Sequence, residues 1–276
     1  MKEIITSRQN PLVKTVCSLS EKKHRRSMKL FRFDGVKLFE EAIFCGIGIE
    51  YVILSEKANL SCNSAVDKAL EEGKLNEEKV VLVSEIAFEK ISEEKAPEGI
   101  ITVARELSTV AERVSGDRMG ELVGEKDRIL IAEALRDAGN LGTVIRSSAA
   151  LGIDTLVLSD DCADLYNPKT IRAAMGGLFR LNIILLDKGE MPLAIKALRA
   201  SGRCVYATAL KEDSTEIGRL SLKRGDCFVI GNEGHGLSDE VIASCDAACI
   251  IPMKKGCESL NASAAAAICI WETVKN

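Results

Sequence analysis

Six short runs between residues 128 and 251 are apolar almost throughout, and segments with helical spacing separate most of them. A strand in a sheet with one solvated face alternates apolar and polar residues, whereas these runs leave no face for water. The runs span residues 128–132, 155–158, 183–186, 204–209, 227–230 and 248–251. The pattern therefore predicts the α/β class, with a parallel sheet covered by helices on both faces.

The first 105 residues show a smaller alternation of the same two elements. Strands are expected at 31–35, 49–54, 80–83 and 99–104, and helices at 11–27, 36–44, 64–72 and 85–91. Loop signals such as Ser115-Gly116-Asp117 then fill residues 106–126, although 107–114 could be helical. We expect a small α/β domain over 1–105, a linker over 106–126 and a larger domain over 127–276.

Composition excludes several classes of protein. No run of about eighteen uncharged apolar residues occurs, so no membrane span is expected. The N-terminus lacks the apolar core of a signal peptide, and the ten cysteines are scattered without a regular spacing, which indicates reduced thiols in the cytoplasm. With no Cys-x-x-Cys and only two histidines, His24 and His235, no metal site is expected.

Positive charge is concentrated at the N-terminal end. Residues 1–40 contain ten Lys or Arg and four Asp or Glu, a net charge of +6, so the other 236 residues carry −10 of the total of −4. Within this segment the residues Lys22, Lys23, Arg25 and Arg26 form a dense basic run. Such a run fits contact with a polyanion and fits a solvated helix face equally well.

Three loops that follow predicted strands combine glycine with short polar side chains. The first, Asp137 to Arg146, opens a helix, where exposed N–H groups attract anions and two glycines let a ligand approach the backbone. The second, Gly231 to Gly236, holds three glycines in six residues. The third, 251–263, places serine and asparagine at the start of an alanine-rich helix. The first and third loops alone also fit helix capping, and the lone His235 of the second is more often exposed and idle, so the combination of the loops carries the indication of a site.

Taken together, the loops resemble the motifs of the SpoU (TrmH-type) RNA ribose 2′-O-methyltransferases of the SPOUT superfamily. Residues 140–146 (Asn-x-Gly-x-x-x-Arg) are similar to the first motif, 231–236 (Gly-Asn-Glu-Gly-His-Gly) to the second, and 251–263 to the third, and 172–181 also matches. The resemblance covers 128–276 strongly. Residues 1–105 resemble, more loosely, the substrate-binding domain that precedes the catalytic domain in many members. Ala138 departs from the pattern, because proline is common there.

The resemblance implies a fold that periodicity does not: a parallel sheet whose C-terminal segment threads a loop to form a deep trefoil knot. The cofactor it implies is S-adenosylmethionine, bound in the knot. The residues that match the cofactor pocket by position are Thr208, Gly231, Ile251 and Leu260. Members of the family are generally homodimers, so a homodimer is expected.

The resemblance also implies the roles of the catalytic residues. Arg146 matches the residue that activates the ribose 2′-hydroxyl, either as a base or as a clamp on the neighbouring phosphate. Asn140 would hold Arg146 or the ribose, and Glu233 would orient Arg146 or the surroundings of the cofactor. Ser259 and Asn261 would hold the motif loops and the nucleotide. The basic segment with Lys22, Lys23, Arg25 and Arg26 would bind RNA phosphates.

Several functions remain open at this point. Ribosomal RNA is favoured over transfer RNA, because the N-terminal domain resembles that of relatives acting on large-subunit ribosomal RNA. A non-catalytic knotted RNA-binding or assembly protein is the main alternative, and a methyltransferase acting on a base is another. A nucleotide-dependent oxidoreductase is disfavoured, because no Gly-x-Gly-x-x-Gly follows an early strand.

Overall fold

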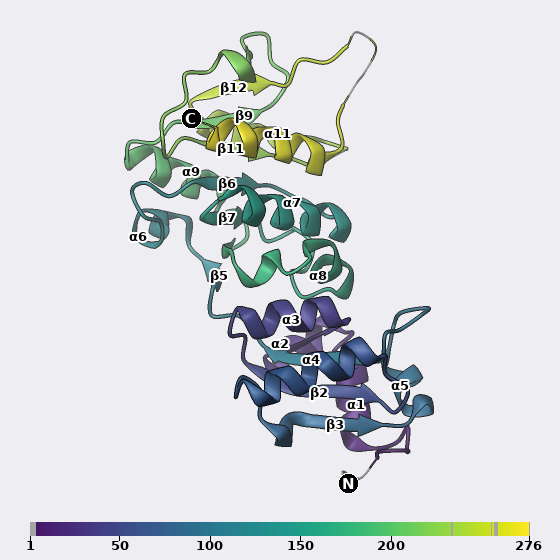
Figure 1. The fold of residues 1–276 in the computed structure, drawn as a ribbon. Coiled ribbons are helices and arrows are strands. Elements are labelled where there is room, and N and C mark those ends of the chain that lie inside the picture. Colours follow the sequence, from purple (N-terminus) through teal and green to yellow (C-terminus); the bar gives the residue numbers. More distant parts are fainter. Residues whose placement is uncertain (1–3, 233, 255, 257–258, 276) are drawn as a thin grey trace. The chain divides into compact units, whose positions relative to one another are not determined.

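The computed structural model describes residues 4–232, 234–254, 256 and 259–275. The chain divides into two compact units, coloured along the sequence in Figure 1. The first unit consists of residues 1–107 and 166–179, and the second of residues 108–165 and 180–276. No helix formed by the described residues is long and apolar enough to cross a membrane.

The strands of the first unit form a four-stranded mixed sheet in the order β1-β4-β2-β3. β2 is parallel to β3, and β4 is antiparallel to both of its neighbours. The strands are β1 (Leu30–Asp34), β2 (Ile49–Ser55), β3 (Val80–Val83) and β4 (Ile100–Arg105). The helices are α1 (Pro11–Ser18), α2 (Lys22–Met28), α3 (Val36–Phe44), α4 (Leu60–Glu71), α5 (Glu85–Ile91) and α8 (Pro168–Ala174), with short 3-10 helices η1 (Glu77–Lys79) and η3 (Gly177–Phe179).

Helices cover both faces of this sheet, as β2 demonstrates. Ile53 packs in a buried apolar cluster with residues of α1 and α5, whereas Val52 and Leu54 pack in a second cluster with residues of α3 and α4. Successive strand residues point to opposite faces, so the two clusters lie on opposite sides of the sheet. The first unit is therefore a three-layer α/β/α arrangement, of which the alternation of elements predicted only the α/β class.

The second unit has eight strands in the order β10-β12-β9-β11-β6-β7-β8-β5, and every neighbouring pair is parallel. The predicted parallel α/β sheet is confirmed. The strands are β5 (Val110–Val114), β6 (Ile129–Ala132), β7 (Thr155–Leu158), β8 (Asn182–Leu186), β9 (Val205–Thr208), β10 (Thr215–Glu216), β11 (Cys227–Ile230) and β12 (Ala247–Ile250). The helices are α6 (Met119–Leu122), α7 (Ala138–Leu151), α9 (Met191–Ala200), α10 (Asp239–Ser244) and α11 (Ala262–Val274), with η2 (Gly116–Arg118) and η4 (Ile217–Arg219).

The chain order creates a switch point between β6 and β11. From β6 the chain continues through α7 to β7 on one side, whereas from β11 it continues through α10 to β12, which lies beyond β9 on the other side. Connections that diverge from two adjacent parallel strands leave room outside the carboxyl ends of those strands. α11 returns to pack against α7 (Figure 1). The topology thus predicts a ligand site at this edge.

Residues 106–126 were expected to be a linker, and the structure differs. β5 pairs with β8 at the edge of the large sheet, so the helix considered for 107–114 is a strand. Val114, Met119 and Val123 are buried in the core of the second unit. The loop interpretation holds for residues 124–127, whereas Gly116 begins η2 and Gly120 lies in α6, and three apolar residues anchor the segment.

Residues 166–179 also differ from the expected division, because they group with the first unit although the sequence places them between β7 and β8. The Tyr166 hydroxyl accepts a hydrogen bond from the Leu107 N–H at 3.0 Å, and its ring lies 4.6 Å from that of Phe31. Phe179 similarly packs against Phe33, with ring centroids 5.4 Å apart. Single-sequence periodicity does not report such long-range aromatic contacts.

Residues 11–27, expected as one helix, form two, α1 and α2, and one residue of the basic run on α2 corrects a prediction. Arg25 is only 4% exposed, and its Nη1 donates to the carbonyl oxygens of Leu19 (2.7 Å) and Ser20 (2.6 Å) in the turn between α1 and α2. The expectation that Arg25 contacts RNA is wrong, because its guanidinium is buried against backbone carbonyls. Lys22, Lys23 and Arg26 are exposed.

Arg25→Ala should lower the free energy of unfolding by about 1–3 kcal/mol, because two carbonyls lose a charged donor. Arg26→Ala, which removes an exposed arginine from the same helix, should change it by less than about 0.5 kcal/mol. Urea denaturation followed by circular dichroism would compare the two. Equal losses in both variants would contradict the structural role of Arg25.

Candidate functional site

A cavity of about 740 Å³ opens at the carboxyl ends of β9, β11 and β12, near the switch point. Parallel strands end at the same edge of a sheet, so the segments that follow them meet there. The described lining residues are Thr208, Ala209, Leu210, Ile230, Gly231, Asn232, Gly234, Gly236, Cys249, Ile250, Ile251, Pro252, Met253, Lys254, Ser259, Leu260, Ala262 and Ala265. The four residues expected to bind the cofactor, and Ser259, are all among them.

Gly231 lets the segment after β11 fold back on itself. A Cβ at this position would lie 2.4 Å from the carbonyl carbon of Gly236, which no side chain tolerates. The fold-back is closed by two backbone hydrogen bonds between Asn232 and Gly236, of 3.1 Å and 2.9 Å. Glycine at 231 is therefore required by close backbone approach, and the backbone rather than side chains forms this wall of the cavity.

Asn232 organises the same segment and was given no role from the sequence. Its Oδ1 accepts from the N–H groups of Gly234 (2.8 Å) and His235 (3.3 Å), and its Nδ2 donates to the Ala134 carbonyl at 2.9 Å. An asparagine two residues before a glycine is a recognisable Asx-turn signal. The contact to Ala134, 98 residues earlier in the chain, has no local signal.

The first and third loops meet through two asparagines. The Asn261 Nδ2 donates to the Asn140 Oδ1 at 3.0 Å, across 121 residues of sequence. Asn261 is also the N-cap of α11, and its Oδ1 accepts from the N–H groups of Ser263 (2.9 Å) and Ala264 (3.3 Å). One side chain therefore fixes the start of α11 and binds the first loop.

The first loop is capped by a residue that the sequence did not single out for this. Asp137 is the N-cap of α7, and its side chain accepts from the Asn140 N–H at 2.8 Å. Because Asp137 caps the helix, the Asn140 side chain is not needed as the cap and can accept the hydrogen bond from Asn261. Ala138, where relatives commonly have proline, is the first residue of α7.

Arg146 lies on α7 and is exposed. Within the described part of the chain it makes no hydrogen bond and no ion pair. An arginine fork without a protein partner is available for a carboxylate or phosphate from outside. Glu233, which was expected to orient Arg146, lies outside the described residues. His235 is exposed.

The cavity walls are largely uncharged. Lys254 is the one lining residue with a full charge among those that the structure describes. The Cys249 thiol is 1% exposed, and burial raises its pKa to about 12, so it is neutral at physiological pH. An apolar cavity with backbone polar groups at its rim fits a mid-sized organic ligand with a flat apolar portion.

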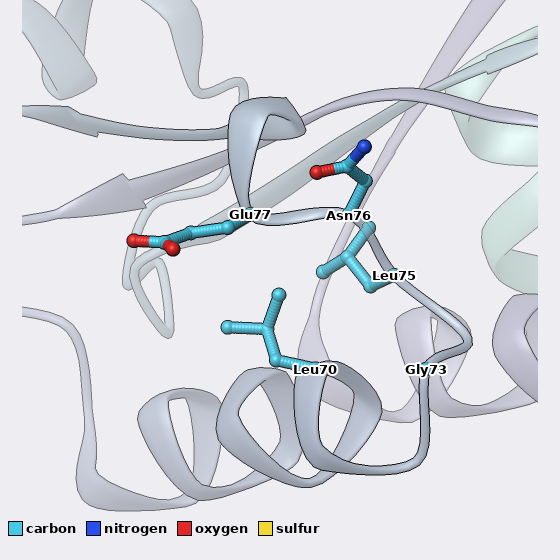
Figure 2. Close-up of a pocket in the computed structure, with 5 residues that line it drawn as sticks. All are labelled: Leu70, Gly73, Leu75, Asn76 and Glu77. Atoms are coloured by element: carbon cyan, nitrogen blue, oxygen red, sulfur yellow. The ribbon is translucent and has the colours of Figure 1, made fainter.

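A second cavity, of about 480 Å³, lies in the first unit between the end of α4 and η1 (Figure 2). Leu70 and Leu75 form its apolar side, and Asn76 and Glu77 contribute the polar groups. None of the residues expected to be functional line it. The lining offers no pair of groups suited to acid–base chemistry.

Comparison with known protein families decides the assignment of the chain. The model of the SpoU rRNA Methylase family matches residues 127–271. The chain belongs to the SpoU rRNA methylase family. A model of the MRM3-like substrate binding domain matches residues 10–102 of the same chain.

Individual relatives of this family resemble the chain over most of its length. The 23S rRNA (guanosine(2553)-2′-O)-methyltransferase RlmP of Bacillus subtilis is 29% identical over 97% of both chains. The 23S rRNA (uridine(2479)-2′-O)-methyltransferase of Streptomyces viridochromogenes is 28% identical over 72% of this chain and 67% of its own. The crystal structure of an AdoMet-bound rRNA methyltransferase from Sinorhizobium meliloti is 26% identical, covers 99% of this chain and 97% of its own, and superposes with a TM-score of 0.81.

The contact between Asn140 and Asn261 can be measured with a double-mutant cycle. Asn140→Ala, Asn261→Ala and the double variant should show a coupling of about 1 kcal/mol in the free energy of unfolding, because the two side chains share one hydrogen bond. Thr143→Ala provides the matched control, since the Thr143 hydroxyl on α7 donates to the Gly139 carbonyl within its own helix. Its effect should add to that of Asn261→Ala, and additivity in the asparagine pair too would refute the coupling.

Proposed function

We propose that this chain transfers a methyl group from S-adenosylmethionine to a ribose 2′-hydroxyl of ribosomal RNA. The observation that carries the proposal is the cavity at the ends of β9, β11 and β12, lined by residues of the second and third family motifs. The third motif in turn is bonded to the first through Asn261 and Asn140. Membership of the SpoU family and the names of the relatives support the reaction and the class of RNA.

The cavity fits the proposed cofactor on several grounds. Its volume of about 740 Å³ lies within the range of sites for ligands of this size. Ile251 and Leu260 offer apolar surface for an adenine ring, and the backbone at Gly231 is open to close approach. When bound, the cofactor supplies a methyl group on a positively charged sulfur. Among the described lining residues Lys254 carries the one full charge, and the Cys249 thiol is neutral because burial raises its pKa to about 12.

The roles of the polar residues follow from their positions. Arg146 is available to clamp the phosphate next to the target ribose and to polarise its 2′-hydroxyl, because it has no partner in the described chain. A free guanidinium has a pKa above about 12, so we assign it orientation rather than removal of the proton. Asn140 and Asn261 hold the start of α7 and α11 in register beside it. Ser259 lines the cavity, and Glu233 is proposed to orient Arg146.

We assign the RNA-binding role to residues 1–105 and the transfer to residues 127–276. Lys22, Lys23 and Arg26 are exposed and contact phosphates in this proposal. The match of residues 10–102 to a substrate binding domain supports it. One relative acts on a guanosine and the other on a uridine. The group that these two substrates share is therefore the ribose and not the base.

Three further properties belong to this proposal. The chain after β12 forms the trefoil knot of the family, and the reaction takes place in the cytoplasm. The protein is a homodimer. Support for the dimer comes from α11, where Trp271 is 56% exposed on a helix that is apolar along most of its length. Burial of such an aromatic against a second copy is favourable.

Arg146→Ala should lower the rate of methyl transfer by about 10²–10³-fold, the effect of removing one charged group that acts on the reacting atoms. The assay uses radiolabelled S-adenosylmethionine and total RNA from a strain that lacks the gene, with RNA from its parent as the blank. Calorimetry should show that cofactor affinity is unchanged. Arg118→Ala, an exposed arginine paired with Glu121, is the control and should retain activity.

The outcomes of this assay separate the candidate functions. Label in ribosomal RNA of the deletion strain supports the proposal. Label in transfer RNA alone would mean that transfer RNA, and not ribosomal RNA, is the substrate. No label in any RNA, together with no cofactor binding, would favour the non-catalytic RNA-binding protein. Arg146→Ala with a rate near that of the wild type would refute the role of Arg146.

Neutralising Lys22, Lys23 and Arg26 together should weaken RNA binding and reduce the slope of log affinity against log salt by about two to three, because each phosphate contact releases counterions. The control replaces Lys57, Lys68 and Lys74, three exposed lysines of the same unit that already form ion pairs. It changes the net charge equally and should leave the slope nearly unaltered. Equal slopes for both triple variants would exclude the proposed contact surface.

A further inference from the structure

The segment between β11 and α10 is attached to the end of β6 at two places. The Glu133 carboxylate accepts from both polar groups of Ser238, the N–H at 2.8 Å and the hydroxyl at 2.7 Å. The adjacent Ala134 carbonyl accepts from the Asn232 side chain at 2.9 Å. The two ends of the fold-back that walls the cavity are therefore bonded to two consecutive residues of a different part of the chain.

Glu133 itself has a fixed position. Its N–H donates to the Ile230 carbonyl at 2.9 Å, which continues the pairing of β6 with β11 by one residue. A carboxylate that accepts two hydrogen bonds from one residue restricts both the distance and the orientation of that residue. Glu133 is half-buried, so these bonds compete less with water than those of a fully exposed side chain.

The next residue is held in an uncommon backbone conformation. Ala134 has φ of +56°, in the left-handed region that disfavours residues with a Cβ. Its N–H donates to the Ser159 Oγ at 2.9 Å, and Ser159 donates to Asp161, which pairs with Arg136. The turn that leads from β6 to the first motif is thus fixed by side chains on both sides.

We propose that Glu133 is a positioning residue for S-adenosylmethionine binding, which holds the cavity wall after β11 in its binding geometry through Ser238. The inference rests on the proposed function. Glu133 does not line the cavity, and it acts through the wall rather than on the cofactor or the RNA. Preorganisation of a wall lowers the cost of ordering it on binding, so its loss weakens cofactor affinity more than it slows the transfer itself.

The test compares Glu133→Ala with Glu240→Ala. Glu240 is an exposed carboxylate in the first turn of α10, and its side chain makes no hydrogen bond or ion pair in the described chain. Calorimetry with S-adenosylmethionine should show an affinity about tenfold lower for Glu133→Ala, the factor that one hydrogen bond to a charged group supports. KM for the cofactor should rise by the same factor, with kcat within about twofold and KM for RNA unchanged. Glu240→Ala should match the wild type.

Two more variants separate positioning from a general loss of structure. In Glu133→Gln the amide oxygen still accepts from the Ser238 N–H, so affinity should recover to within about threefold of the wild type. Ser238→Ala removes the hydroxyl donor and leaves Glu133 in place, and it should fall between Glu133→Ala and the wild type. Hydrogen exchange of the Ser238 amide without cofactor should be faster in Glu133→Ala and near normal in Glu133→Gln.

Failure of the inference and failure of the proposed function give different results. A wild-type protein that does not bind S-adenosylmethionine refutes the proposed function and with it this inference. A wild type that binds, with Glu133→Ala and Glu240→Ala equal to it in affinity and amide exchange, overturns the inference alone. If Glu133→Ala does not fold, Glu133→Gln and Ser238→Ala are compared instead. An affinity of Ser238→Ala for S-adenosylmethionine equal to that of the wild type then overturns the inference.

Discussion

The parallel pairing of β6 with β11 is the constraint on which the site depends. These two strands lie side by side although Cys227, at the start of β11, is 98 positions after Ile129, at the start of β6 (227 − 129 = 98), and their connections leave in opposite directions. Loops that end adjacent strands at a switch point necessarily face one another. The first two family motifs follow these two strands, and α11, which packs on α7, adds the third. A change of strand order would separate the motifs even if every loop kept its own conformation.

Much of this arrangement could be predicted from the sequence because its signals are local. Apolar runs predicted six of the eight strands of the parallel sheet, all except β5 and β10. Glycine-rich loops after two of them predicted where a ligand approaches the backbone. The need for glycine at position 231 was indicated by such a local signal. Its cause, a close contact with Gly236 five residues later, is visible only in the structure. The resemblance to the SpoU family then indicated which loops form one site. The periodicity of the sequence carries no information on this point.

The parts that could not be predicted depend on contacts between distant residues. Arg25 belongs to a basic run, but its guanidinium binds the carbonyls of a turn that the helical spacing of 11–27 had concealed. Val114, Met119 and Val123 anchor a segment whose composition resembles a linker. Tyr166 and Phe179 pack against rings on β1. In each case tertiary burial overrides a local signal, and a single sequence reports only the local signal.

The hydrogen bonds around the site connect its parts more closely than the motifs suggest. From α11, Asn261 binds Asn140, whose N–H is held by Asp137. Asp137 follows Arg136, which pairs with Asp161, and Asp161 is bonded through Ser159 to the backbone of Ala134. Ala134 and Glu133 hold Asn232 and Ser238 at the cavity wall. Each link is modest, about 1 kcal/mol, but a polar network with satisfied members specifies one arrangement of its loops. Residues 133–137 are therefore the segment through which the cavity wall and the residues beside Arg146 are held in one geometry.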